Sequence, residues 1–166
     1  MKMASLKDLY LEELQDLYSA ENQILKALPK MAKASQNEEL KNALMHHCEE
    51  TQGQVDRLQK AFEALGKRPR GQTCEAINGL IEEGDEVVEE FEQGTVRDAG
   101  IVACAQAVEH YEMPRYGTIV EWAKSTGHED IVRLMQETLE EEKKADGLLT
   151  QMANRSINPE AVKQAA

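Results

Sequence analysis

Apolar residues recur every three or four positions along five stretches of this sequence, and four of the stretches are long. In the second, the apolar stripe begins with Leu40 and Leu44 and resumes with Leu58 and Phe62. This spacing places side chains on one face of an α-helix, so each stretch predicts an amphipathic helix. Ala, Leu, Glu, Lys and Gln are abundant and aromatic residues make up only 4% of the chain, which favours an all-α fold.

Capping signals indicate where these helices begin and end. Ser5 and Asp8 have the spacing of a capping box, Ser35 repeats the signal before the second helix, and Thr73 is expected to cap the third. Gly66 should end the second helix in a left-handed conformation. The five helices are therefore expected at roughly 5–34, 35–66, 73–94, 95–124 and 128–153.

Four long helices joined in pairs, with a shorter helix between the pairs, predict a four-helix bundle of two antiparallel hairpins with an additional helix in the long crossover. At about 1.5 Å per residue, the third helix spans on the order of 30 Å and can return the chain along the bundle. The second and fourth helices then run parallel, as in ferritin-like bundles. We expect a ferritin-like helical domain over residues 1–153 and a loosely ordered C-terminal tail over 154–166, where the apolar period is lost.

Each long helix carries a carboxylate in its apolar stripe. Glu21 and Glu50 are separated by 29 residues in the first hairpin, and Glu112 and Glu142 by 30 residues in the second. Because the helices of a hairpin run antiparallel, each pair should lie at a similar depth. Since the two hairpins are built alike, a pseudo-twofold arrangement would gather these carboxylates at the middle of the bundle.

Several buried carboxylates cannot all remain ionised unless a cation compensates them, because desolvation and mutual repulsion raise their pKa values. Ferritin-like di-iron and di-manganese proteins solve this problem with carboxylates that bridge two metal ions. Oxygen ligands favour iron, manganese or magnesium over copper. We therefore predict a site for one or two such ions, and its candidate ligands are Glu21, Glu50, Gln54, Glu109, Glu112 and Glu142.

The Glu-x-x-His pattern that is typical of such sites is absent. The third residue after Glu50 is a glycine, and the third residue after Glu142 is an alanine. Gln54 and Asp146, one position further along each helix, could supply an oxygen ligand or a hydrogen bond. His47 lies on the inward stripe, where it could bind a metal ion or simply pair with a neighbouring polar group. The sequence leaves the roles of His47, His110 and Asp146 open.

Net charge indicates which classes of partner are unsuitable, and cysteine content indicates the redox state of the compartment. The net charge of -12 argues against nucleic acid or an anionic membrane surface as the main partner. Three cysteines without a CxxC or metal-knuckle spacing favour a reducing compartment. No stretch approaches the roughly 20 apolar residues that cross a bilayer, and no signal-peptide run is present. We expect a cytoplasmic protein.

The sequence resembles the YciF-like bacterial stress proteins, a ferritin-like family. The segments that carry the resemblance include LYSAENQILKALPKMAKA, HHCEETQGQVDRL and AQAVEHYEMPRYGTI, and it extends over residues 5 to about 153. It implies a five-helix ferritin-like domain, a homodimer, a role in bacterial stress responses and a di-metal site. The inward acidic residues would then be Glu21, Glu50, Glu109, Glu112 and Glu142, with Gln54 beside them.

Two functions follow from these patterns. The first is a metal-binding protein of the stress response that reacts with a small oxidant, O₂ or peroxide, at an open coordination position. The second is a non-catalytic helical stress protein, whose inward carboxylates are partly protonated or paired with tyrosines and whose exposed faces bind itself or a partner. Iron storage in a cage is a third alternative, for which the sequence shows no supporting feature.

Overall fold

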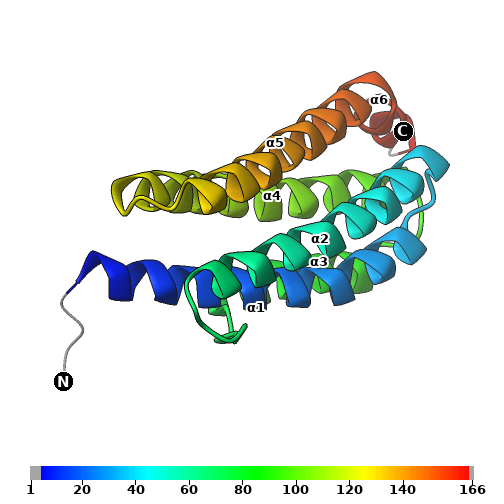
Figure 1. The fold of residues 1–166 in the computed structure, drawn as a ribbon. Coiled ribbons are helices and arrows are strands. Elements are labelled where there is room, and N and C mark those ends of the chain that lie inside the picture. The colour runs from blue at the N-terminus through cyan, green and yellow to red at the C-terminus, as the bar shows by residue number, and fades with distance from the viewer. Residues whose placement is uncertain (1–4, 165–166) are drawn as a thin grey trace.

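The computed structural model of the protein describes residues 5–164, and in that range its regular structure is entirely helical (Figure 1). The all-α fold predicted from the sequence is confirmed. Over the same residues, no helix is long and apolar enough to cross a membrane. The helices are α1 (Leu6–Ala34), α2 (Glu38–Ala64), α3 (Glu75–Glu90), α4 (Thr95–Ser125), α5 (Glu129–Met152), the π-helix η1 (Ala153–Ile157) and α6 (Asn158–Gln164).

The four long helices lie as two hairpins. α1 packs along α2 and α4 packs along α5, and the hairpins meet where α2 contacts α5 and α1 contacts α4. Figure 1 shows that α3 returns the chain along the bundle, so that α2 and α4 run in the same direction. α3 itself lies against α4 and α1. The inward faces of the four long helices therefore surround one common interior.

The beginning of α1 and the end of α2 form as the capping signals predict. The Ser5 hydroxyl accepts a hydrogen bond from the Asp8 N–H at 3.2 Å, and the Asp8 carboxylate accepts one from the Ser5 N–H at 3.3 Å. Gly66 follows α2 with a φ of 66°, a left-handed conformation that glycine adopts without steric cost.

Two predicted helix starts are wrong by one or two residues. Asn37 rather than Ser35 caps α2, because the Ser35 hydroxyl donates instead to a carbonyl in the last turn of α1. α3 begins after Cys74 rather than Thr73, and Cys74 provides no side-chain cap. The Gln23 side chain of α1 accepts a hydrogen bond from the Cys74 N–H at 3.1 Å. A tertiary contact thus replaces the local cap that the sequence predicts.

Two apolar clusters occupy the interior, one on each side of a band of polar side chains. Leu28 and Leu44 belong to the first cluster, and Leu14 and Phe62 belong to the second. We call the band between them the polar layer. Its buried members are Glu21, His47, Thr51, Gln54, Glu109, Glu112, Thr138 and Glu142. Burial of the apolar clusters stabilises the fold, whereas burial of the polar layer opposes it unless its groups find partners.

The C-terminal segment is helical, which differs from the loosely ordered tail expected over 154–166. Within the described residues, η1 and α6 continue the chain to Gln164. Ile157 is buried in the first apolar cluster. The Gln164 side chain accepts a hydrogen bond from the Thr95 N–H at 3.1 Å, at the start of α4. A single buried side chain and a few distant hydrogen bonds leave no periodic pattern, so the sequence alone did not indicate this packing.

A buried carboxylate of α4 supports the start of α2. Asp98 is fully buried, and its two oxygens accept hydrogen bonds from the N–H groups of Gln36 at 2.9 Å and Asn37 at 2.8 Å. Backbone N–H groups at the beginning of a helix lack partners within that helix. Asp98 supplies acceptors at this point and thereby ties the second hairpin to the first.

Replacing Asp98 with alanine should therefore lower the free energy of unfolding by about 1–3 kcal/mol, because two backbone donors lose a charged acceptor. In a domain of this size, each kcal/mol corresponds to a decrease in Tm of about 2–4 °C. Asp98→Asn keeps one acceptor oxygen and the side-chain shape, so its loss should be smaller. Thermal unfolding followed by circular dichroism measures both, and an Asp98→Ala protein that melts with the wild type would contradict the assignment.

Candidate metal centre

Four side chains of the polar layer converge between α2, α4 and α5. One potential ligand atom from each of His47, Glu109, Glu112 and Glu142 lies within 4.8 Å of all the others. These residues expose only 5%, 2%, 0% and 0% of their surface, respectively. Glu109 and Glu112 are three residues apart and therefore occupy one face of α4. We call these four residues the central group.

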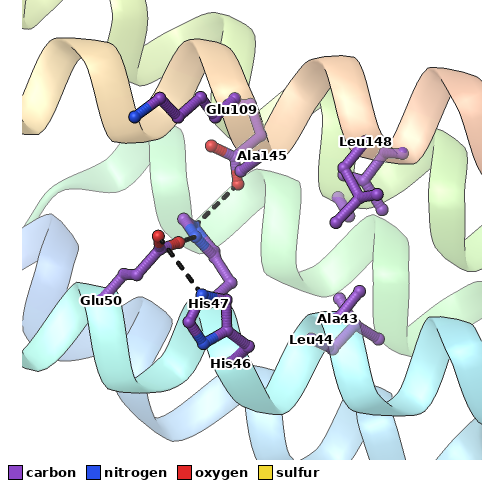
Figure 2. A pocket seen from close by; sticks show the side chains of 11 residues that line it. Ala43, Leu44, His46, His47, Glu50, Glu109, Ala145 and Leu148 are labelled. Carbon is purple, nitrogen blue, oxygen red and sulfur yellow. Dashed lines mark hydrogen bonds and ion pairs between the residues drawn. The ribbon is translucent and has the colours of Figure 1, made fainter.

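His47 connects the central group to a carboxylate at its edge (Figure 2). Its Nε2 lies 2.9 Å from Glu109 Oε1 and 4.0 Å from Glu142 Oε1, while its Nδ1 lies 3.2 Å from Glu50 Oε2. Burial by itself would lower the pKa of this imidazole. The surrounding carboxylates, above all Glu109, outweigh burial and raise the pKa of His47 well above its ordinary value. In the metal-free protein, the fold therefore favours the protonated form of His47.

The buried acidic residues are shifted toward their protonated forms. Burial, followed by the charge of Glu142, raises the pKa values of Glu109 and Glu112 well above the ordinary range. The same two causes raise the pKa of Glu21 to about 8, although the Tyr116 hydroxyl donates a hydrogen bond to its carboxylate. When no cation is bound, protons must neutralise the carboxylates of the polar layer.

Six buried side-chain oxygens of the polar layer have no hydrogen-bond partner among the described residues. They are both carboxylate oxygens of Glu112 and one oxygen each of Glu21, Gln54, Glu109 and Glu142. Buried polar atoms in proteins are nearly always paired, because an unpaired one has lost its water without replacement. A concentration of unpaired carboxylate oxygens in one layer therefore points to a cation as their partner.

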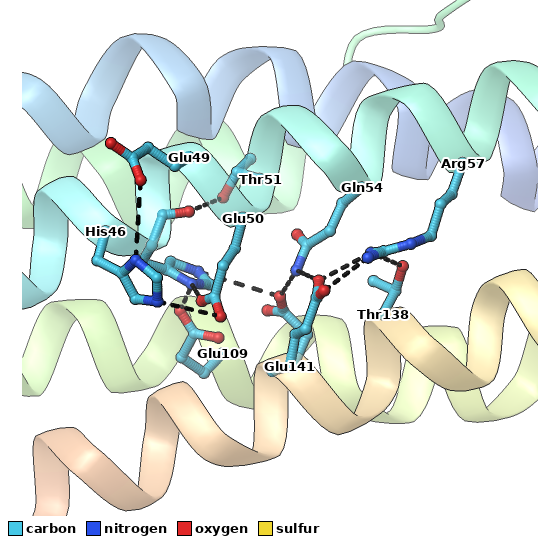
Figure 3. A network of polar contacts seen from close by, with 11 residues as sticks. His46, Glu49, Glu50, Thr51, Gln54, Arg57, Glu109, Thr138 and Glu141 are labelled. Carbon is cyan, nitrogen blue, oxygen red and sulfur yellow. Dashed lines mark hydrogen bonds and ion pairs between the residues drawn. The ribbon is translucent and has the colours of Figure 1, made fainter.

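Gln54 orients one of these carboxylates. Its Nε2 donates to Glu142 and also, at 3.1 Å, to Oε2 of Glu141. Arg57 holds Glu141 from the other side through two hydrogen bonds of 2.6 and 2.8 Å (Figure 3). This chain of contacts fixes the position of the Glu142 carboxylate, as the outer partners of metal ligands commonly do. Of the two roles that the sequence left open for Gln54, the structure shows the hydrogen bond.

Glu50 lies at the edge of the polar layer. Its side chain is 25% exposed, and it approaches His46 Nε2 at 3.6 Å in addition to His47. The hydrogen bond with His47 is the main reason that the pKa of Glu50 is lowered. Glu50 is therefore an ionised carboxylate between the central group and solvent, whereas equal helical depth predicted that it would lie in the middle.

The structure places all six predicted ligands in or beside the polar layer, but only three of them belong to the central group. The fourth member is His47, one turn before Glu50 on the same stripe, and that spacing was its signal in the sequence. His110 and Asp146 instead pair with each other at 3.1 Å, away from the central group, and the His110 side chain is exposed.

The chemistry of these donors suits iron or manganese. Carboxylate oxygens with one imidazole form a mainly hard ligand set, and the excess of negative charge favours a divalent or trivalent cation. His47 can give up its proton and bind through Nε2 when a cation replaces that proton. The arrangement can therefore hold either protons or metal ions, and the two compete for the same side chains.

Comparisons with known proteins establish relatives over nearly the whole chain. Residues 5–162 match the model of a family described as a domain of unknown function, DUF892. The chain is 42% identical to Protein YciF of Escherichia coli K12, over 99% of this chain and 100% of that protein. The crystal structure of the E. coli stress protein YciF aligns with a TM-score of 0.90 and 43% identity, covering 94% of this chain and 99% of that one.

Two further solved structures share the fold. YcfI of Rhodopseudomonas palustris aligns with a TM-score of 0.87 and 50% identity, covering 90% of this chain and 95% of that one. A protein of Xanthomonas campestris aligns with a TM-score of 0.78 over 98% of this chain and 100% of that one. At 20% identity, the last comparison concerns the fold alone.

The raised pKa values predict that the metal-free protein loses stability as the pH rises. Glu21 keeps its proton to about pH 8 in the folded state but only to about 4.5 when unfolded, so in this interval the folded state binds more protons. His47 acts in the same direction, because folding favours its protonated form. The Tm of metal-free protein should fall by several degrees between about pH 5.5 and about pH 8.

Glu112→Gln provides the variant for this test, because it removes one titrating group from the polar layer while it preserves the side-chain shape. Its Tm should depend less on pH than that of the wild type. Glu140→Gln changes an exposed glutamate of α5 and should leave the pH dependence unaltered. Equal slopes for wild type and Glu112→Gln would show that the polar layer does not control stability.

Proposed function

The chain belongs to the DUF892 family, and we propose that it is a ferritin-like protein of the bacterial stress response that binds one or two iron or manganese ions in its polar layer. The stress role is proposed from the E. coli relative, whose structure is described as that of a stress protein. Since the family description assigns no activity, the proposed chemistry rests on the side chains of this chain.

The observation that carries the metal proposal is the environment of Glu112. Its side chain is fully buried, both of its oxygens lack partners in the described part of the chain, and it faces the carboxylates of Glu109 and Glu142. An uncompensated buried charge costs several kcal/mol, and adjacent like charges add to that cost. A divalent ion would neutralise these carboxylates and occupy their unpaired oxygens at the same time.

The central group would hold the ions, and Glu142 is the carboxylate that lies closest to the other acidic members. Glu142 is the charge that, after burial, contributes most to raising the pKa values of Glu21, Glu109 and Glu112, so it lies near all three. Glu21 would extend the ligand set toward α1. Glu50, at the edge, would complete the coordination on the side that faces solvent.

Bound iron or manganese would supply electrons for the reduction of O₂ or peroxide. The chain's own residues would supply protons and orientation. His47, if it binds through Nε2, would still hold a proton at Nδ1 beside Glu50, and the Tyr116 hydroxyl donates to Glu21. Reduction of hydrogen peroxide to two waters consumes two electrons and two protons, and these groups are placed to deliver protons to the polar layer.

The alternative is a non-catalytic helical protein that acts through its surface. In that case, protons on His47 and on the buried carboxyls would neutralise the polar layer permanently. Several large apolar side chains are exposed, which offers contact area for a homodimer or another partner. They are Leu6, Leu9, Met45, Phe91, Val96, Leu148 and Val162.

We propose a homodimer in the cytoplasm as the working state of either function. The net charge of -12 makes nucleic acid and anionic membranes unsuitable partners, because their phosphates would be repelled. The three free cysteines are compatible with a reducing compartment. A small oxidant is the only substrate that the proposed metal chemistry requires.

Protein expressed in medium supplemented with iron and manganese should contain one to two metal ions per chain. Elemental mass spectrometry measures this content. Glu142→Gln should lose most of this metal, because it removes the shared charge of the central group. Chelation should lower the Tm of the wild type, since an ion that binds only the folded state stabilises it.

Glu140→Gln is the matched control for this experiment, since it makes the same change on the exposed face of the same helix. It should retain metal at the wild-type level. Metal-free wild-type protein would contradict the proposal and leave the surface function as the explanation, and so would metal content that is unaffected by Glu142→Gln.

The iron(II) in iron(II)-loaded protein should be oxidised faster after hydrogen peroxide is added than after buffer alone is added. His47→Gln should slow the oxidation by peroxide at least tenfold. The reason is that His47 is both a candidate ligand and a buried proton donor. His46→Gln is the neighbouring control, because the His46 side chain is largely exposed and points to Glu49 and Glu50. Stopped-flow absorbance of iron(III) measures the oxidation rate of the wild type and of both variants. Equal rates for the wild type and His47→Gln would show that His47 has no role in the mechanism.

A further inference from the structure

An apolar cavity adjoins the central group, and the proposed oxidation of metal by a small oxidant makes no use of it. Its volume is about 200 Å³, and residues of α2, α4 and α5 line it. Figure 2 shows His47, Glu50 and Glu109 at one end and Leu44 and Leu148 toward the other. The cavity therefore has a polar end beside the central group and an apolar body that extends away from it.

Small residues create this space. Ala43 of α2, Ala105 of α4 and Ala145 of α5 face the cavity, and a larger side chain at any of these positions would fill part of it. Leu44 and Leu149 complete the buried apolar wall. The exposed side chains of His46, Lys144 and Leu148 also line the cavity and form its solvent side.

Glu109, which lines the inner end of the cavity, has a carboxylate oxygen that is unpaired among the described residues when no metal ion is bound. Glu109 is 2% exposed, and its Oε2 has no hydrogen-bond partner within residues 5–164. Its Oε1 lies 2.9 Å from His47 Nε2, at the same end of the cavity. A hydroxyl or hydroperoxyl group at this position could donate a hydrogen bond to Glu109, which a purely apolar molecule could not do.

Size and charge define the class of ligand. A cavity of about 150 Å³ with apolar walls accommodates benzene, so one of about 200 Å³ accepts a somewhat larger body with a polar head. An anionic head at the inner end would meet the ionised carboxylate of Glu50. The imidazole of His47 would not attract that head, because it is already paired with Glu50 at 3.2 Å and Glu109 at 2.9 Å.

We infer that this cavity is a binding site for small uncharged organic molecules that have an apolar body and one hydroxyl or hydroperoxyl group. An organic hydroperoxide and the alcohol derived from it belong to this class. The inference deepens the proposed function, because it names the substrate class of the metal centre. Binding itself depends only on side chains of the chain, so it can be measured without metal.

Benzyl alcohol is a suitable probe, and methyl NMR spectra of the metal-free full-length protein provide the readout. Titration should shift the methyl signals of Ala43, Ala105 and Leu148 and give a dissociation constant on the order of 1 mM. Benzoate, which has a similar size but a negative charge, should bind at least tenfold more weakly. Benzoate binding as tight as that of benzyl alcohol would overturn the assignment of an uncharged ligand.

Ala145→Leu should weaken benzyl alcohol binding at least tenfold, because the added carbon atoms occupy the cavity. Ala103→Leu makes the same change at an exposed position of α4 and should bind like the wild type. If Ala145→Leu does not fold, Ala43→Val fills the opposite wall and takes its place. Wild-type shifts that map elsewhere, or unchanged binding to the cavity-filling variant, would refute the site.

Metal content measured on the same preparations separates this inference from the proposed function. Benzyl alcohol binding in a protein that never takes up iron or manganese would support the cavity as a ligand site and refute the metal centre. Metal uptake without alcohol binding would support the metal centre and refute the cavity as a substrate site.

Discussion

Carboxylates buried between two apolar clusters govern the organisation of this helical bundle. The clusters supply the hydrophobic stabilisation, and the polar layer between them places Glu21, Glu109, Glu112 and Glu142 where water cannot solvate them. The layer must therefore be neutralised by protons, by metal ions or by both. Stability, metal affinity and reactivity all follow from which of these is present, because each changes the charge of the same few side chains.

Side chains that contact the carboxylates of the polar layer determine their orientation and their charge. His47 links Glu109 to Glu50, Tyr116 donates to Glu21, and Gln54 holds Glu142. These contacts come from different helices, so they bind the two hairpins together as well as orient the carboxylates. They also leave Glu112 without a donor among the described residues, which makes it the group most in need of a cation.

Prediction from the sequence succeeded where a pattern repeats along one helix. The apolar period predicted the long helices, and the same period showed that Glu21, Gln54, Glu109, Glu112 and Glu142 face inward. Prediction failed where a distant side chain replaces the expected helix cap. At the start of α3, the Gln23 side chain of α1 accepts a hydrogen bond from the Cys74 N–H in place of a cap by Thr73. Prediction also overestimated the burial of Glu50, because equal depth along the bundle does not distinguish the centre of a helix face from its edge.

Local propensity and periodicity were sufficient to predict the class of fold, the presence of the long helices and the set of acidic side chains that share the interior. Helix packing brings His47 to three of those carboxylates, leaves Glu50 at the edge and opens a cavity beside them. These features depend on the rotation and spacing of helices that pack against one another. A one-dimensional period specifies the face of a helix, but it does not specify the distance between atoms on two faces.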